Sequence, residues 1–388
     1  MANLIQNGGI MNSEIGLIKT EMTVGILTYH RSQNYGAQIQ AFALQEFLRS
    51  LGCGVSIIDY WPEYHKNLYK PKFFVDKKFF KSRSIWGKMK LIIRSIVLFF
   101  LSCLRKRSTN CFVKKLLNVS SSRSYDIAVY GSDQIWRKQH MYPFESYNPI
   151  YFGDDQIEAR YKISYAASMG RIEAENDEDI SFLRSHFQRF DAISVREKEL
   201  CDFISKKLEI ESQVVCDPVL LLTKEQWNGL IPNGKDKKYY IFKYNLVGIP
   251  EIDEIALLLS NRYHTPIVEY CGYVNQVNRS SIRNVTSSAI DFLRDLMNAE
   301  YVVTSSFHGV ALSLCFEKQF YFASIKELSN RTENLLEKLD LKDRIISGKC
   351  LENIDFSCYI DYSVVSGKLS SFRIESASWL ISRIKSFN

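Results

Sequence analysis

A single histidine marks a point in the chain where chemistry is possible. In VVTSSFHGVALSL, residues 302–314, His308 lies between a β-branched apolar run and a helix-like apolar run. A strand followed by a helix leaves free backbone N–H groups at the helix start, and these attract phosphate or carboxylate. Ser305 and Ser306 can cap the helix or add donors. Beside a bound anion, the imidazole can act as a general acid or base. The alternative is a structural, half-buried histidine behind a capping serine.

The segments around this point follow an α/β pattern. Thr23–Tyr29 predicts a buried strand, Gln38–Ser50 a helix with apolar residues at helical spacing, and Val55–Tyr60 the next strand. Further strands are predicted at 125–130, 161–165, 192–195, 213–216, 239–245, 266–270 and 301–304. Strand–helix–strand units form parallel sheets whose ligand sites lie at the carboxyl ends of the strands. The sequence therefore predicts an α/β fold of two doubly wound, Rossmann-like domains that face a cleft.

Length and composition fit two domains of ordinary size. The 388 residues are 46% hydrophobic and 24% charged, which is typical of a globular protein. The polar stretch 225–238 is the predicted linker between an N-terminal domain of residues 22–224 and a C-terminal domain of residues 239–388. Residues 1–21 show no signal-peptide pattern and are expected to form a disordered leader. The nine scattered cysteines form no CxxC pair, which indicates reduced thiols and a cytoplasmic protein.

The net charge of +7 is concentrated in one segment. Residues 65–115 contain fifteen Lys and Arg against one acid, Asp76, so the rest of the chain is net negative. Within this basic insert, the apolar run 91–104 contains Arg94 and is too short to cross a bilayer. Such an element can lie on an anionic membrane surface, or it can be a buried core helix beside a solvated basic loop. Nucleic-acid binding is disfavoured because no recognition motif accompanies the charge.

Seven stretches of the chain occur in the order typical of one known family. They are GILTYHRSQNYGAQIQAFALQ (25–45), YDIAVYGSDQIW (125–136), YAASMG (165–170), DAISVREKE (191–199), CDPVLLL (216–222), VVTSSFHGVALSL (302–314) and SNRTENLLEKLDL (329–341). On these stretches the chain resembles the polysaccharide pyruvyl transferase family over residues 24–345. The resemblance implies a two-domain fold similar to the GT-B glycosyltransferase architecture. It also implies transfer of a pyruvyl group from phosphoenolpyruvate to a sugar, usually as a cyclic ketal across two hydroxyls.

The resemblance also assigns roles to residues on the donor side. The family's donor-binding arginine corresponds to Arg196, its histidine to His308, and a further family arginine to Arg331. A donor with a phosphate and a carboxylate needs fixed cations and oriented N–H donors, and a guanidinium fork suits both anions. We therefore expect His308 to be catalytic. The residues expected to bind the donor are Arg196, Ser305, Ser306 and Arg331.

The first strand–helix joints are expected to face the acceptor sugar. Asn34, Tyr35 and Gly36 form the first joint, where glycine permits close backbone approach. Asp133, at the end of its strand, can hold or deprotonate a sugar hydroxyl, and Trp136 can stack on a sugar ring. The alternatives are turn chemistry for Asn34 and Gly36, a helix cap for Asp133 and core packing for Trp136.

The resulting hypothesis is a pyruvyltransferase of bacterial capsular or exopolysaccharide synthesis. Its acceptor would be a galactose or similar hexose, modified at the 4- and 6-hydroxyls and carried on a polyprenyl diphosphate at the cytoplasmic face of the inner membrane. The donor substrate would be phosphoenolpyruvate, and no cofactor or metal is implied. The alternatives are a GT-B-type glycosyltransferase that uses a nucleotide sugar, or a non-catalytic glycan-binding or membrane-scaffolding protein. For Arg196, the alternative is a salt bridge with Glu197 or Glu199.

Overall fold

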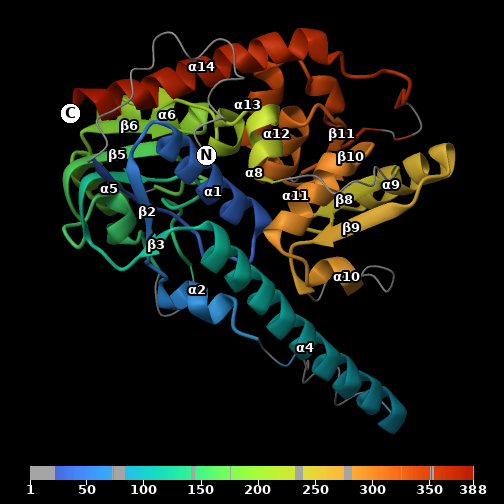
Figure 1. Ribbon diagram of the computed structural model, residues 1–388. Helices are drawn as coiled ribbons and strands as arrows, with labels where there is room; N and C mark the ends of the chain where they lie inside the picture. Colours follow the sequence, from blue (N-terminus) through green and yellow to red (C-terminus); the bar gives the residue numbers. More distant parts are fainter. Residues whose placement is uncertain are drawn as a thin grey trace.

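The computed structural model describes residues 22–71, 73, 84–140, 145–174, 176–231, 239–274, 282–324, 326–349, 351 and 354–387. The predicted leader 1–21 lies outside these residues. Two separate parallel sheets form the framework (Figure 1). The first contains β1 (Thr23–Leu27), β2 (Gly54–Ile58), β3 (Val119–Ser120), β4 (Ser124–Tyr130), β5 (Glu158–Ala167), β6 (Ala192–Val195) and β7 (Gln213–Val214). The second contains β8 (Ile241–Asn245), β9 (Ile267–Cys271), β10 (Tyr301–Thr304) and β11 (Gln319–Phe322).

Both sheets are doubly wound. The strand orders are β3-β2-β1-β4-β5-β6-β7 and β11-β10-β8-β9, and neighbouring strands pair in parallel throughout. The strand order therefore reverses between β1 and β4 in the first sheet and between β8 and β10 in the second. Ligands of such sheets bind outside the carboxyl ends of the strands, near the point of reversal. The predicted α/β class with two Rossmann-like units is confirmed.

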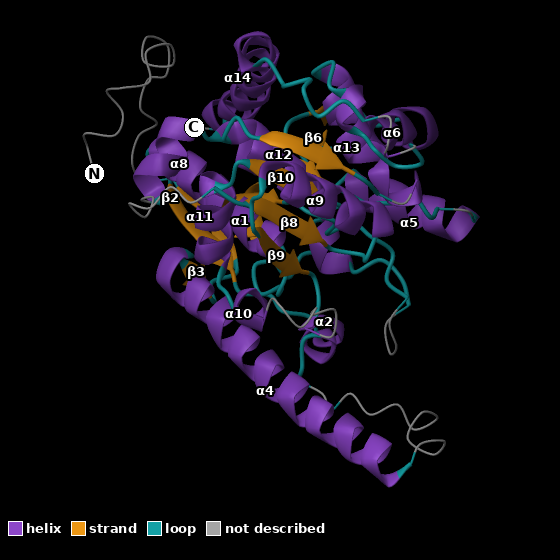
Figure 2. Ribbon diagram, turned by 90° about the vertical axis from the view of Figure 1, so that its right-hand side faces the viewer, coloured by secondary structure: helices purple, strands orange, loops and turns teal. Residues whose placement is uncertain are grey.

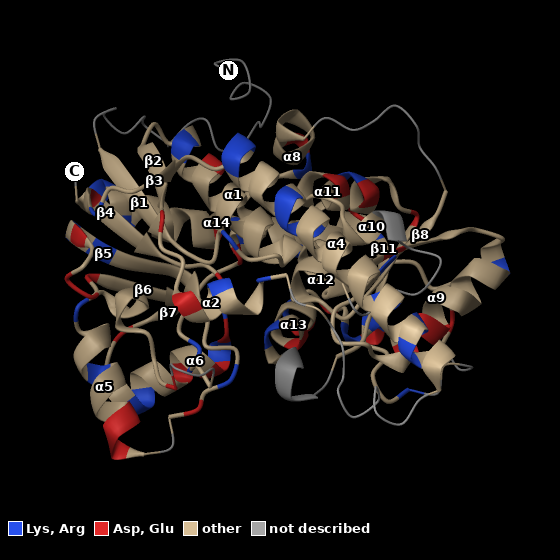
Figure 3. Ribbon diagram, turned by 90° about the horizontal axis from the view of Figure 1, so that it is seen from below, with Lys and Arg blue, Asp and Glu red and all other residues tan. Residues whose placement is uncertain are grey.

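Helices cover the sheets and join them. They are α1 (Tyr35–Ser50), α2 (Glu63–Leu68), α4 (Ile85–Leu116), α5 (Asp177–Phe187), α6 (Lys198–Phe203), α7 (Pro218–Leu221), α8 (Lys224–Leu230), α9 (Pro250–Tyr263), α10 (Ile282–Val285), α11 (Ala289–Asn298), α12 (Phe307–Cys315), α13 (Lys326–Lys338) and α14 (Tyr362–Ser386). Seen from below, the two sheets lie side by side with α12 and α13 between them (Figure 3). The carboxyl ends of strands from both sheets can therefore contribute to one site.

The predicted linker 225–238 is partly a helix. Residues 224–230 form α8, which begins with a capping box in which Thr223 and Gln226 satisfy each other's backbone N–H groups. Trp227 is fully buried, and its indole donates to the carbonyl of Val219. The first part of the predicted linker is therefore helical and anchored by one buried side chain, which its polar, glycine-containing composition did not indicate. Residues 232–238 of the linker lie outside the described residues.

The last helix of the chain returns to the first sheet. Helix α14 crosses the top of the molecule in Figure 1. The hydroxyl of Ser376 accepts from the backbone N–H of Cys216, and the Arg373 guanidinium donates to the carbonyl of Leu220. At its end Phe387 stacks on Tyr161 of β5, with ring centroids 3.9 Å apart. Residues 362–387 thus pack on the first half of the chain, although they follow the second sheet in sequence.

Helix α4 connects β2 to β3 and extends far beyond the sheets. It spans 32 residues, and its N-terminal half projects from the body in two perpendicular views (Figures 1 and 2). Its C-terminal half is anchored by Arg105, which donates to the carbonyls of Gln33 and Cys271 and lies 4.9 Å above the ring of Tyr35. Arg105 therefore ties α4 to both halves of the molecule. Within the described residues, no helix has the length and apolarity required to span a bilayer.

Replacing Arg105 with Met should destabilise the fold strongly. The substitution leaves the carbonyls of Gln33 and Cys271 without their donors in a buried place, at a cost of about 3 kcal/mol. Urea unfolding followed by tryptophan fluorescence measures this loss. Arg107→Met on the exposed side of the same helix is the control and should change stability little. Equal effects of the two variants would contradict the anchoring role of Arg105.

Candidate active site

Polar residues that follow strands of both sheets meet at one place. Asp133 follows β4, Arg196 follows β6 and Asp217 follows β7 in the first sheet, while His308 begins α12 after β10 of the second sheet. Their side chains lie in the interior: the side chain of Arg196 is 2% exposed, that of His308 6% and that of Asp217 0%. These groups are thus buried, and they come from both halves of the molecule.

Asp217 occupies the centre of this arrangement. It is the N-cap of α7, and its Oδ1 atom accepts the backbone N–H of Val219 at 3.1 Å. The other oxygen, Oδ2, accepts from Nη1 of Arg196 at 2.6 Å and from the hydroxyl of Ser132 at 3.1 Å. The same oxygen lies 3.7 Å from Nε2 of His308. Burial opposes the charge on Asp217, but the interactions with the protonated form of His308 and with Arg196 outweigh it and lower the pKa of the carboxyl.

The imidazole of His308 is held in a tightly packed, buried position. A Cβ atom added to Gly36 would overlap Nδ1 and Cγ of His308, so the first turn of α1 lies directly against the ring. Burial lowers the pKa of His308 to about 4, with the Asp217 carboxylate opposing this shift and Arg196 adding to it. The imidazole is therefore neutral at neutral pH. Its Nε2 atom is buried, and no hydrogen-bond partner for it exists among the described residues.

Two guanidinium groups lie close to one aromatic ring. The Cζ atom of Arg196 lies 4.9 Å, and that of Arg331 on α13 lies 5.5 Å, from the ring centroid of Phe307. In the part of the chain that the structure describes, Nε and Nη2 of Arg196 and Nε and Nη1 of Arg331 lack a hydrogen-bond partner. Burial, together with the charge of Arg196, lowers the pKa of Arg331 to about 10. Two buried cations with unpaired donors are suited to an anionic ligand.

Glu197 adds a second carboxylate on the other side of Arg196. Its Oε1 atom accepts from the hydroxyl of Ser168 and lies 3.9 Å from Nε of Arg196. Burial raises the pKa of Glu197, although Arg196 and Arg331 partly offset the shift. The predicted alternative, a salt bridge between Arg196 and Glu197, thus exists at long range. The short ion pair of Arg196 is with Asp217, which is distant in sequence.

Asp133 borders the site with an unusual backbone. Its φ of 76° lies in the left-handed region that residues with a side chain rarely adopt. The carboxylate accepts the N–H of Gln134 at 2.8 Å, and its Oδ1 atom lies 4.0 Å from Nη2 of Arg196. The charge of Asp133 also acts on the buried His65 and Tyr69. Asp133 therefore lies close to the Arg196 guanidinium and near enough to His65 and Tyr69 to affect their pKa values.

Comparison with known proteins identifies the family of the chain. The sequence profile described as "Polysaccharide pyruvyl transferase" matches residues 34–326, which is most of the chain. The chain belongs to the polysaccharide pyruvyl transferase family. Membership confirms the predicted family and the prediction that the protein is a transferase, with a role in pyruvyl transfer to polysaccharide. A search of curated proteins gave no match.

Solved structures similar to this chain are glycosyltransferases. The glycotransferase of kitacinnamycin has 10% identity and a TM-score of 0.43, with 94% of this chain and 98% of that chain covered. The glycosyltransferase SnogD from Streptomyces nogalater has 10% identity and a TM-score of 0.42, with 94% and 99% covered. The spinosyn rhamnosyltransferase SpnG has 10% identity and a TM-score of 0.40, with 94% and 99% covered.

The serines predicted to bind the donor have different surroundings. The hydroxyl of Ser305 accepts the backbone N–H of Leu246 at 2.8 Å and lies 3.4 Å from Oδ1 of Asn245, so it is engaged with the segment after β8. Ser306 occupies the N-cap position of α12 but makes no side-chain capping bond. Its backbone N–H donates instead to the hydroxyl of Thr304. Of the two serines, Ser306 directly precedes the Phe307–His308 pair of the site.

The side chains of Asn34 and Tyr35, at the first strand–helix turn, make contacts within the fold. Asn34 caps α1, because its side-chain oxygen accepts the N–H of Gly36 at 2.9 Å. This contact corresponds to turn chemistry, the alternative given for this residue. Tyr35 is buried between the halves, where its hydroxyl donates to the carbonyl of Asn284 and its ring stacks on Phe292. Gly36 contacts the catalytic candidate itself. These placements bring Gly36 to the site and engage the side chains of Asn34 and Tyr35 in the fold.

Trp136 is a core residue. It is fully buried, its indole N–H donates to the carbonyl of Tyr151, and its ring packs on Phe152 and Phe187. The alternative of core packing therefore holds for this residue. Asp133 is not the helix cap that its alternative supposed, since the described residues directly after it form no helix.

Asp217 and Glu197 were not among the site residues expected from the sequence. Asp217 lies in CDPVLLL, where a strand is followed by Asp-Pro and an apolar helix. An Asp before a Pro at the first helical position is a cap signal at the carboxyl edge of a parallel sheet, and it could have marked the residue. Glu197 was considered only as the partner of Arg196. Sequence spacing does not show that Asp217 lies near His308 or that Glu197 lies near Arg331.

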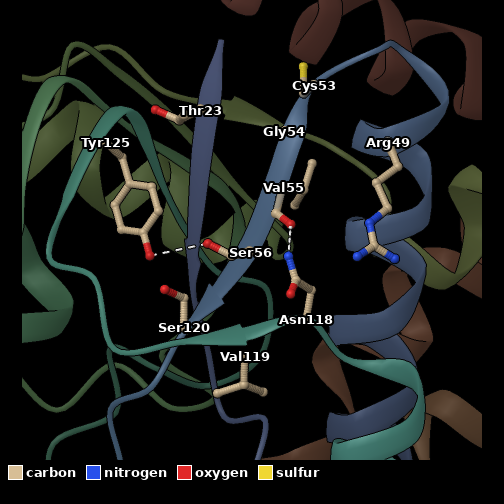
Figure 4. Close-up of a pocket in the computed structure, with 10 residues that line it drawn as sticks. All are labelled: Thr23, Arg49, Cys53, Gly54, Val55, Ser56, Asn118, Val119, Ser120 and Tyr125. Atoms are coloured by element: carbon tan, nitrogen blue, oxygen red, sulfur yellow. Dashed lines mark hydrogen bonds between the residues drawn. The ribbon is translucent and has the colours of Figure 1, made fainter. Parts of the chain in front are cut away.

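One surface pocket lies away from these residues. A pocket of about 560 Å³ is lined by residues at the starts of β1, β2 and β4, among them Thr23, Gly54 and Tyr125 (Figure 4). Its polar groups are partly paired, as Ser56 donates to Tyr125 and Asn118 to the carbonyl of Val55. It lies at the amino edge of the first sheet, opposite to the edge that carries Asp133 and Arg196. We therefore assign no part of the active site to it.

Replacing His308 with Gln should weaken the acid sensitivity of the fold. The pKa of His308 is about 4 in the folded chain against an ordinary value of 6.5, so the unfolded chain binds the proton more readily between these values. The native state consequently loses stability as the pH falls through this window, by at most about 3 kcal/mol from this group. Urea unfolding of both proteins across the window measures the difference. Replacement of the exposed His264 with Asn is the control, and equal slopes for all three proteins would contradict the prediction.

Gly36→Ala should destabilise the protein although alanine favours helices. In an unconstrained helix the change stabilises by roughly 0.5–1 kcal/mol. At position 36 the new methyl group overlaps the His308 ring, so we expect a lower thermal midpoint. Gly367→Ala on α14 is the matched control, because nothing lies within 4 Å of its Cβ position, and it should raise the midpoint. A gain in both variants would show that Gly36 is not in contact with His308.

Proposed function

We propose that this protein transfers the pyruvyl group of phosphoenolpyruvate to a sugar, and that Arg196, Arg331 and His308 bind and activate this donor. One observation carries the proposal: around His308, the guanidiniums of Arg196 and Arg331, from opposite halves of the molecule, each have two buried nitrogen atoms without a hydrogen-bond partner among the described residues. A buried N–H donor without an acceptor costs about 1–3 kcal/mol, and more when the group is charged, so these donors are suited to a ligand that supplies oxygen acceptors. Phosphoenolpyruvate is a small molecule with a phosphate and a carboxylate, and each can accept a guanidinium edge.

The carboxylates of the site are compatible with an anionic donor. Asp217 uses Oδ2 for one nitrogen of Arg196, so the other edge of this guanidinium stays open. Within the described residues Arg331 has no acidic partner at ion-pair distance. Since burial raises the pKa of Glu197, this group can take up a proton when an anion arrives. The site therefore has two cations directed at the ligand and one carboxyl able to become neutral.

The proposed reaction runs through His308. Nε2 of His308 takes the proton of a sugar hydroxyl, and the imidazolium that forms passes this proton to the methylene carbon of the donor. The central carbon becomes oxocarbenium-like, and the oxygen of the same hydroxyl bonds to it. The phosphate then leaves, and a neighbouring hydroxyl closes the ketal as its proton passes to the phosphate. A neutral imidazole with a free Nε2 can relay these protons. The Asp217 carboxylate, 3.7 Å away, stabilises the imidazolium that forms during the relay.

The proposed acceptor side is the region around Asp133. The carboxylate can accept a sugar hydroxyl, and the neighbouring Tyr69 and Ser32 hydroxyls, 2.8 Å apart, offer further polar contacts. We propose a hexose with two suitably spaced hydroxyls, such as the 4- and 6-hydroxyls of galactose. We further propose that this hexose belongs to a bacterial capsular or exopolysaccharide precursor on a polyprenyl diphosphate at the cytoplasmic face of the membrane.

Product analysis tests the proposed reaction. The protein is incubated with phosphoenolpyruvate and candidate galactosides, phosphate release is followed, and the product is examined by mass spectrometry. We expect stoichiometric phosphate release and a sugar that carries the pyruvyl increment. Transfer of a hexose from a nucleotide sugar, with no reaction of phosphoenolpyruvate, would overturn the proposal in favour of a glycosyltransferase.

Replacing Arg331 with Met should impair use of the donor. Loss of one charged donor from a buried anion site lowers kcat/KM by about 100-fold, and we expect most of this in the KM for phosphoenolpyruvate. Arg383→Met on α14 is the matched control, because Arg383 also lies over an aromatic ring, 5.9 Å from the Trp379 centroid, but is exposed and outside the site. Unchanged kinetics of Arg331→Met would remove Arg331 from the donor site.

A further inference from the structure

The projecting half of α4 exposes an unusual number of large apolar side chains. Trp86 is 72% exposed, Ile93 57% and Phe100 62%. The full set on this helix is Ile85, Trp86, Met89, Ile92, Ile93, Ile96, Val97, Phe100 and Leu104. Next to them Phe73, itself exposed, stacks on Phe99 with ring centroids 4.5 Å apart. A contiguous apolar surface of this kind on a water-exposed helix indicates an interaction site.

This apolar surface is not the face with which α4 packs on the protein. The buried residues of the helix are Ser95, Leu98, Ser102, Arg105, Thr109, Phe112 and Val113, which repeat at three- and four-residue intervals. At about 100° per residue the exposed apolar residues repeat in the same way but centre on the opposite side of the helix. The helix thus has two separate interaction faces. The inner one, mostly in its C-terminal half, holds the body, and the outer one, in its N-terminal half, is exposed in this structure.

The charges on α4 are of one sign. The helix contains eight Lys and Arg and no Asp or Glu. Lys88 and Lys90 lie on either side of the outer apolar face by helical geometry, and Arg94 is exposed beside it. Long cationic side chains at the edges of an apolar face can extend to phosphate groups while their stems contact hydrocarbon. This combination is typical of helices that lie in the interface of an anionic bilayer.

We propose that residues 85–104 of α4 form a docking element for an anionic lipid bilayer, with the outer apolar face inserted among the acyl chains. The alternative occupant, a second copy of α4, would place cations opposite cations, because the helix offers no acid to pair with them. An anionic lipid surface supplies the opposite charge. The proposal is independent of the pyruvyl donor.

The base of this arm lies at the active site. Arg105 bonds the carbonyl of Gln33, one residue before the cap of α1, and α1 in turn places Gly36 against His308. At about 1.5 Å per residue, the arm reaches roughly 30 Å from Ile85 to Arg105. A bilayer bound along the arm would lie close to the acceptor side of the site. Docking would therefore bring a membrane-borne acceptor within reach.

Vesicle co-sedimentation tests the docking without any substrate. The full chain is mixed with vesicles of phosphatidylcholine and phosphatidylglycerol, or of phosphatidylcholine alone, at low and high salt. We expect binding to the anionic vesicles that weakens with salt, and much weaker binding to the neutral ones. Ile93→Glu/Phe100→Glu should reduce the partition coefficient by about 100-fold. Lys90→Glu/Arg94→Glu should reduce binding to the anionic vesicles alone.

A matched control separates this effect from general surface changes. Leu257→Glu on α9 alters an apolar residue of similar exposure, 56%, and should leave vesicle binding unchanged. Pyruvyl transfer to a water-soluble galactoside should persist in the α4 variants, so failure of docking and failure of the proposed reaction are distinguishable. The proposal is overturned if the wild-type chain ignores anionic vesicles at low salt. It is also overturned if the α4 substitutions only convert a dimer to a monomer in sedimentation velocity.

Discussion

The carboxylate of Asp217 is the interaction on which the rest of the site depends. One oxygen starts α7, and the other fixes Arg196 and Ser132 and faces His308. The short helix α7 is itself held from several directions, since two of its carbonyls accept from the indole of Trp227 and the guanidinium of the last helix. A buried carboxylate is stable only when it is charge-paired and hydrogen-bonded. The structural pairing that keeps Asp217 ionised is therefore the same pairing that orients the cation and the imidazole.

The site forms where residues that follow strands of the first sheet meet residues that follow strands of the second sheet. The first sheet supplies Arg196, Asp217 and Asp133, while the second supplies His308 and, through α13, Arg331. Close packing at the boundary keeps the imidazole neutral and leaves guanidinium edges unpaired among the described residues. Unpaired guanidinium donors are unfavourable in a buried place and would be satisfied by an anion that supplies oxygen acceptors. The α4 anchor and the stack beneath the first turn of α1 hold the boundary from the other side.

Helix α4 has one face that packs on the protein and one face that is exposed to the outside. Its inner face contacts the segment that precedes α1 through Arg105. Its outer face is left uncovered by the described part of the chain. Since an exposed apolar surface is unfavourable in water, its retention indicates a partner with an apolar interior. Because the charged residues of α4 are all cationic, we infer that this partner has a negatively charged surface.

The sequence by itself determined the α/β class, most strands, the family, the choice of His308 and Arg196, and the basic, apolar character of residues 65–115. These follow from local signals: apolar runs that end at polar joints, and motifs that each lie within about twenty residues. Only the tertiary structure decided the two faces of α4 and the partners of the site residues. Asp217 and Arg196 are 21 residues apart, and His308 is farther still, so no spacing rule could place them around one oxygen. In the same way, the sequence did not show that Gly36, from the first half of the chain, lies against the imidazole of His308 from the second half. Sequence patterns specify how each segment folds, whereas burial of charges at a shared boundary depends on how the segments meet.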